Sequence, residues 1–163
     1  MAGKYQYKEG GYKLTEQMKR DFNENGFIMV RNFLDDEELT NIKKAIEDNS
    51  TILSNAFGVA DDTGKDAQLS LWNHPGNDVT GMVARCEKIV NTCEHLLGGE
   101  VYHYHTKLMM KAAKKGGKHV WHQDYGGQNL SNDRRWAFLC AYNKATNNPV
   151  KKHHHPCYTP LVK

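Results

Sequence analysis

The chain has 163 residues, a length that suits one domain with a hydrophobic core of its own. Its formal net charge is only +3, and its lysines are spread along the chain, which argues against nucleic-acid binding. No segment approaches the roughly 20 consecutive apolar residues that a membrane-spanning helix needs. The amino terminus lacks the apolar stretch of a signal peptide, so we expect a cytoplasmic protein that does not bind membranes.

The first half of the chain predicts two amphipathic helices. Thr15 can cap the first, and Gly26 suits its end. The apolar run 27–30 then predicts a short buried strand. A capping box starting at Asp35 opens the second helix, which should end near Asn49. Its predicted buried face carries Leu39, Ile42 and Ile46.

The middle of the chain changes its pattern twice. Residues 60–78 are rich in Gly, Asp and Asn and predict a long loop or an irregular strand pair. Apolar residues at intervals of three and four then predict a single helix over 79–97. From residue 100 the period becomes two, which indicates a strand with a polar face. That face should carry His103, His105, Lys107 and Met109.

This order of elements, helices first and strands afterwards, predicts an α+β fold or helices packed outside a β-barrel. The four cysteines form no Cys-x-x-Cys pair, and we expect reduced thiols rather than disulfides. Cys86 and Cys93 lie seven positions apart on the expected third helix, which favours packing over a redox role.

The sequence His-Gln-Asp-Tyr at residues 122–125 is the strongest chemical signal. In a strand, His122 and Asp124 leave the same face, so both can point at one ion. An imidazole and a carboxylate are two of the three ligands of the facial triad that holds Fe(II) in non-haem oxygenases. The alternative is an ordinary His and Asp on an exposed strand.

Further stretches agree with this signal and share a pattern with one known family; they are residues 14–17, 25–27, 32–35, 37–39, 71–78, 108–111, 114–125 and 144–148. Together they resemble the phytanoyl-CoA dioxygenase family of Fe(II)- and 2-oxoglutarate-dependent oxygenases. The resemblance covers about residues 14–148 of what we expect to be a single domain, 1–163, and the tail 149–163 diverges from it.

The resemblance implies a double-stranded β-helix, the jelly roll or cupin-like fold, with amino-terminal helices buttressing one sheet. This chain would hold about the first half of that fold. The implied activity is hydroxylation of a small organic substrate. Fe(II) would be the cofactor and 2-oxoglutarate the cosubstrate, with ascorbate as a candidate additional cofactor.

The resemblance also assigns the site residues. His122 and Asp124 would be the metal-binding and catalytic residues. Gln123 leaves the opposite face of the strand and would orient the cofactor's surroundings. Lys107 matches a position that lines the 2-oxoglutarate pocket and could meet a cosubstrate carboxylate. The alternative for Lys107 is an exposed charge.

The chain departs from the family pattern after residue 124. A second iron-binding histidine and a cosubstrate-binding arginine are expected well downstream, but the last arginine is Arg135. We therefore expect a truncated or alternatively spliced product, with three alternatives for its role: an enzyme, a catalytically silent binding or regulatory protein, or a metal binder using His153, His154 and His155. Open sheet edges would favour a homodimer or a partner protein.

Overall fold

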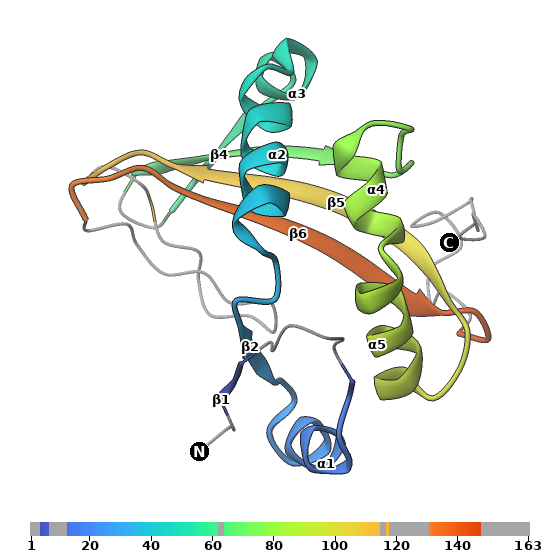
Figure 1. Cartoon of the computed structure of the whole chain (residues 1–163). Helices are drawn as coiled ribbons and strands as arrows, with labels where there is room; N and C mark the ends of the chain where they lie inside the picture. Colours follow the sequence, from blue (N-terminus) through green and yellow to red (C-terminus); the bar gives the residue numbers. More distant parts are fainter. Residues whose placement is uncertain (1–3, 7–12, 62–63, 115–116, 118–130, 148–163) are drawn as a thin grey trace.

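The computed structural model describes residues 4–6, 13–61, 64–114, 117 and 131–147. Its main sheet has four antiparallel strands in the order β3-β4-β5-β6. Helices cover one face of this sheet (Figure 1). The α+β prediction is confirmed at this level, and the arrangement agrees with one sheet of the implied fold. The strands are β3 (Phe57–Ala60), β4 (Asp66–Trp72), β5 (Val101–Lys111) and β6 (Arg135–Lys144).

Five helices are present among the described residues: α1 (Glu16–Asn25), α2 (Asp36–Glu47), α3 (Ser50–Ser54), α4 (Val79–Arg85) and α5 (Glu87–Leu97). The predicted caps are confirmed. The Thr15 side chain accepts a hydrogen bond from the backbone N–H of Met18, and α1 ends at Gly26 with φ 78°. Asp35 and Glu38 form a reciprocal capping box at the start of α2.

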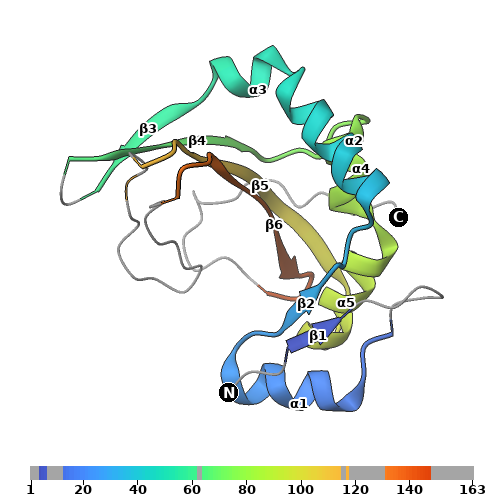
Figure 2. The same ribbon diagram turned by 60° about the vertical axis from the view of Figure 1, so that its left-hand side comes forward.

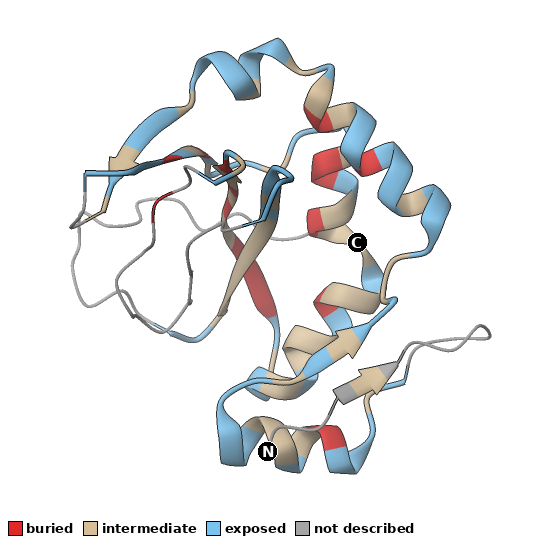
Figure 3. Ribbon diagram, turned by 90° about the vertical axis from the view of Figure 1, so that its left-hand side faces the viewer, coloured by how far each residue is buried: buried red, intermediate tan, exposed pale blue. Residues whose placement is uncertain are grey.

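The hydrophobic core lies between α2 and the middle of the sheet. Ile42 and Ile46 of α2 pack against Leu108 of β5, which is completely buried. Figure 3 shows buried residues concentrated along β5 and on the helix sides that face it. Leu39 was predicted for the same buried face of α2, but 55% of it is exposed. That part of the prediction is wrong, because Leu39 lies at the edge of the contact.

The predicted buried strand at 27–30 is also wrong in its burial. The structure forms β2 (Met29–Arg31), which pairs in parallel only with β1 (Lys4–Gln6), apart from the main sheet (Figure 2). Phe27 is 53% and Met29 40% exposed. A two-stranded ribbon has little cover, so its apolar side chains stay in contact with solvent.

The single helix predicted over 79–97 is two helices. The backbone of Cys86, with φ −57° and ψ 121°, ends α4 and begins α5. The apolar spacing continues across this break because both helices pack inward, α4 against α2 and α5 against β5 and β6. Spacing alone therefore could not reveal the interruption.

Residues 60–78 contain a regular strand rather than a long loop. The strand-pair alternative is confirmed in part, since β4 lies in this range but pairs with β3, which ends at Ala60, in a regular antiparallel register with Phe57 opposite Leu69. The alternation of Ala67, Leu69 and Leu71 was the available signal. Cys86, Cys93 and Cys140 are free thiols, and burial raises the pKa of Cys93 to about 11. All three are half-buried, in agreement with the expected packing.

No helix among the described residues combines the length and apolar character needed to cross a membrane. The second sheet of a jelly roll is not part of the described ranges, so the structure supports a helix-covered antiparallel sheet and nothing finer. Several predicted residues also fall outside those ranges: His122, Gln123, Asp124, Cys157 and the histidines of the tail 149–163.

Candidate active site on the sheet

A β-bulge in β5 separates the two histidines that were expected to share a face. His103 lies opposite Tyr142, whereas His105 lies opposite Ala141, which leaves Tyr104 as the extra residue. The His103 ring meets the Tyr142 ring edge-on, and the Tyr142 hydroxyl donates to the Ala84 carbonyl of α4. His103 therefore faces the helices and His105 the opposite side. The period-two prediction is wrong at His103.

His103 is a structural residue with both ring nitrogens in contact. Its Nδ1 lies 3.2 Å from the Asn73 carbonyl oxygen and its Nε2 2.7 Å from the Thr106 hydroxyl. Burial lowers the pKa of His103, the Asn73 carbonyl opposes that shift, and the nearby His74 adds to it. The neutral ring must donate from Nδ1 to the carbonyl, so Nε2 accepts from Thr106. His103 is thereby unavailable to the opposite face.

That opposite face, away from the helices, carries the polar residues that suit a site. Alternation along β5 after the bulge places His105, Lys107, Met109 and Lys111 there. Lys107 has apolar neighbours across both adjacent strands, because its partners are Leu71 in β4 and Leu139 in β6. A cation among apolar side chains binds a carboxylate more strongly than an exposed one, since solvent screens it less.

Lys111 is the residue of this face that the sequence analysis did not single out. It is only 1% exposed, and Arg135 of β6 lies directly opposite. Burial lowers the pKa of Lys111, Arg135 lowers it further, and the nearby Asp61 carboxylate raises it. The period of two that led to Lys107 continues to Lys111 and could have found it. Its burial follows from the tertiary fold.

The segment that carries His122 and Asp124 is joined to this end of the sheet. The backbone N–H of Lys114 donates to the Ser131 carbonyl over 3.1 Å, so the two flanks of residues 118–130 meet. The N–H of Gly117 donates to the Asp66 carbonyl over 3.2 Å, at the start of β4. The structure thus shows where the residues on either side of this segment contact each other and the sheet. His122, Gln123 and Asp124 themselves lie outside the described residues.

No group of three or more His, Cys, Asp or Glu side chains within the described ranges could hold a metal ion. His103 and His105 consequently do not assemble a metal centre with other described residues. The chemistry of the His122 and Asp124 pair does fit Fe(II), which accepts imidazole and carboxylate ligands. These two predicted ligands lie in the sequence between Gly117 and Ser131, outside the described residues.

The stretch 71–78, which contributed to the family resemblance, forms the turn from β4 into α4. Asp78 caps α4 by accepting from the N–H of Gly81 over 2.9 Å. Arg85 donates to the Gly76 carbonyl over 2.8 Å. A Cβ atom at Gly81 would lie 1.7 Å from the Gly76 oxygen, so only glycine fits there. The described contacts give this motif a structural role.

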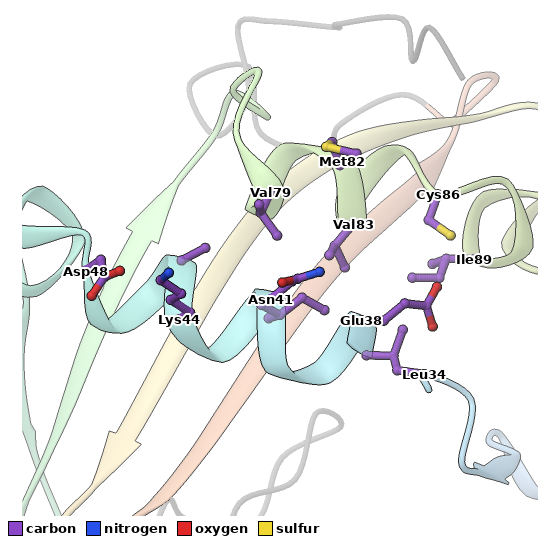
Figure 4. A pocket seen from close by; sticks show the side chains of 12 residues that line it. Leu34, Glu38, Asn41, Lys44, Asp48, Val79, Met82, Val83, Cys86 and Ile89 are labelled. Carbon is purple, nitrogen blue, oxygen red and sulfur yellow. The ribbon is translucent and has the colours of Figure 1, made fainter. Parts of the chain in front are cut away.

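A cavity of about 590 Å³ lies on the helix side of the sheet, between α2 and the α4–α5 pair. Val79 and Val83 point from α4 toward α2 across it (Figure 4). Its wall is mostly apolar, with Glu38 and Asp48 among its polar members. The sheet separates this cavity from Lys107, so it is distinct from the candidate active site.

The family model of phytanoyl-CoA dioxygenase matches residues 22–148, which include the whole main sheet and the His-x-Asp sequence. The chain belongs to the phytanoyl-CoA dioxygenase family.

Curated relatives agree with that family. The chain is 25% identical over 125 residues to ectoine dioxygenase of Bordetella parapertussis, covering 73% of this chain and 40% of the relative. It is 30% identical over 105 residues to L-proline trans-4-hydroxylase of Streptomyces griseoviridis, covering 64% and 38%. The chain thus spans about 40% of the length of these relatives. No solved structure matches it significantly.

Proposed function

We propose that this chain acts as an Fe(II)- and 2-oxoglutarate-dependent oxygenase that hydroxylates a small organic substrate. The observation that carries the proposal is the family match over residues 22–148, because it spans both the sheet and the His-x-Asp sequence. The relatives support it, since their names give ectoine and L-proline, both small organic molecules, as what they act on.

In this proposal His122 and Asp124 hold the iron, and Gln123 orients the groups around them. Bound Fe(II) with 2-oxoglutarate would activate dioxygen, so that one oxygen atom leaves in succinate as 2-oxoglutarate loses carbon dioxide and the other becomes the hydroxyl oxygen of the substrate. Lys107 neutralises the charge of a cosubstrate carboxylate, and the apolar residues Leu71 and Leu139 lie opposite it on the two neighbouring strands.

The alternative function is a binding or regulatory protein without turnover, and one observation favours it. On the face away from the helices, Leu71 is 46% exposed, and Phe57 of the edge strand β3 is 50% exposed. Exposed apolar side chains beside a strand edge favour contact with a second copy or a partner protein.

An anaerobic titration with Fe(II) and 2-oxoglutarate separates the two functions. The oxygenase should develop the weak visible charge-transfer band of a 2-oxo acid chelated to iron, at one equivalent of iron, and His122→Ala should abolish it. A folded wild-type chain without the band would contradict the proposed activity and leave the binding function. A band that survives in His122→Ala would contradict the ligand assignment.

A further inference from the structure

The turn between β3 and β4 contacts the chain just before the His-x-Asp sequence. Gly117 is buried, and its N–H donates to the Asp66 carbonyl over 3.2 Å. A Cβ atom at Gly117 would lie 2.2 Å from the Lys65 carbonyl oxygen and 3.2 Å from Oδ2 of Asp61. Real Cβ atoms do not come that close to backbone oxygens, so any other residue at 117 must displace the turn or itself. Glycine is therefore required at position 117 because there is no space for a side chain.

Hydrogen bonds within the β3–β4 turn stabilise the conformation that Gly117 contacts. The Asp61 N–H donates to the Lys65 carbonyl over 2.9 Å, and the Lys65 N–H donates to Oδ1 of Asp61 over 2.9 Å. The Gly64 N–H donates to the Asp61 carbonyl over 3.0 Å. Asp61 therefore makes contacts through its backbone and its side chain. The Lys65 oxygen that meets Gly117 is fixed by the same residue.

Asp61 also influences the polar face of the sheet. Its carboxylate favours the charged form of the buried Lys111 ammonium, against the effects of burial and of Arg135. The turn is thus linked to β5 by charge and to Gly117 by backbone contact. These links meet at the end of the sheet where Lys114 and Ser131 hold the two flanks of residues 118–130 together.

We propose that the β3–β4 turn positions the iron-binding segment, and that Gly117, five residues before His122, is the positioning residue through which it acts. The inference rests on the proposed function, because His122 and Asp124 must bind the metal. It adds a determinant of iron affinity that touches neither metal nor substrate. A change in the β3–β4 turn that Gly117 contacts should misplace the iron ligands. It should not unfold the helix-covered core, which lies on the other face of β5.

The test compares Gly117→Ala with Gly58→Ala in anaerobic Fe(II) titrations followed by the charge-transfer band. A Cβ atom at Gly58 would meet its nearest neighbour, Nε2 of Gln68, at 3.5 Å, an ordinary contact, so this variant is the matched control in the same hairpin. We expect Gly117→Ala to weaken Fe(II) binding by about tenfold or more, the range seen when groups that orient metal ligands are lost. Gly58→Ala should bind iron like the wild type.

A second pair of variants keeps the inference testable if Gly117→Ala fails to fold. Asp61→Ala removes the side-chain acceptor for the Lys65 N–H, whereas Asp66→Ala removes a neighbouring exposed carboxylate and keeps the backbone carbonyl that accepts from Gly117. Asp61→Ala should weaken Fe(II) binding several-fold, and Asp66→Ala should not. Amide hydrogen exchange at Gly117 should quicken in Asp61→Ala alone.

The outcomes separate the inference from the function it rests on. A wild-type chain that binds no Fe(II) overturns the proposed function, and the inference with it. A wild-type chain that binds Fe(II) together with folded Gly117→Ala and Asp61→Ala variants of unchanged affinity overturns the inference alone. Selective loss of affinity in Gly117→Ala or Asp61→Ala, with unchanged thermal unfolding, supports it.

Discussion

The two faces of β5 differ in how their residues are satisfied. On the helix side, Leu108 and Thr106 are completely buried, and His103 has a partner at each ring nitrogen. On the opposite side, Lys107 and Lys111 alternate with Met109, and the neighbouring Leu71 is 46% exposed. One face therefore maintains the fold, and the other carries two lysines beside a partly exposed apolar side chain.

This difference shows why residues of the same type on one strand have different roles. His103 and His105 are two positions apart, yet the bulge at Tyr104 directs one into a hydrogen-bonded core and the other to the polar face. Substitutions on the two faces should then have different effects. Those on the helix side should change the stability of the fold, and those on the other side should change ligand binding.

The largest expected effect is loss of packing at Leu108. Leu108→Ala should lower the free energy of unfolding by about 3 kcal/mol, because it leaves a cavity against Ile42 and Ile46. Leu71→Ala on the other face should cost about 1 kcal/mol, since much of that side chain is already in water. Urea unfolding of both variants measures the difference. Equal losses would mean that both faces are covered alike.

Removing the hydroxyl group that bonds to His103 should have the second-largest effect on stability. Thr106→Val keeps the shape of the side chain but leaves the buried Nε2 of His103 without its donor, which should cost about 1–3 kcal/mol. Thr40→Val is the control, because Thr40 is exposed and its hydroxyl donates to the Asp36 carbonyl within α2. Denaturation at constant pH measures both. A loss no larger than that of the control would contradict the core role of His103.

The lowered pKa of His103 predicts a smaller, pH-dependent effect. The unfolded chain takes up this proton near pH 6.5, before the folded chain does, so stability should fall as the pH drops below 6.5 toward the folded pKa. One proton limits this slope to about 1.4 kcal/mol per pH unit. Unfolding measured between pH 7.5 and 5.5 should show a shallower slope in His103→Gln. An unchanged slope would assign the dependence to other groups.

Lys107→Met should have the smallest effect on stability, within about 0.5 kcal/mol, since the methionine fits among Leu71 and Leu139. Affinity for 2-oxoglutarate should instead fall about tenfold, the cost of one charge-assisted hydrogen bond. Lys43→Met, at an exposed position of α2, should change neither quantity. Calorimetric titration with 2-oxoglutarate and Fe(II) checks this. Unchanged affinity in Lys107→Met would make Lys107 an ordinary strand cation.

Local rules predicted what depends on neighbours in the chain. The capping residues Thr15 and Asp35 and the end of α1 at Gly26 act within a few residues and are confirmed, and the period of β5 is confirmed from His105 onward. The helix break at Cys86 was missed, because the same apolar spacing serves one bent or two separate helices.

Part of the site could likewise be predicted from the sequence, and part could not. The sequence alone indicated the family, which the family match confirms, and the period that leads to Lys107. The assignment of His122 and Asp124 as ligands stays a prediction. It could not give the contact between Gly117 and the Lys65 carbonyl, because 52 positions separate them and no pattern marks the approach. It also could not show that Tyr104 is bulged out of register.

The amino-acid sequence by itself thus determined the caps of α1 and α2, the strand period of β5 beyond the bulge and the residue types present, because these depend on local dihedral preferences and on residue type. Only the tertiary structure decided which face of β5 each residue occupies, why a charged Lys111 is 1% exposed, and where the His-x-Asp segment is attached. The physical reason is that burial and register are set by strands far apart in the chain, whose contacts no local pattern specifies.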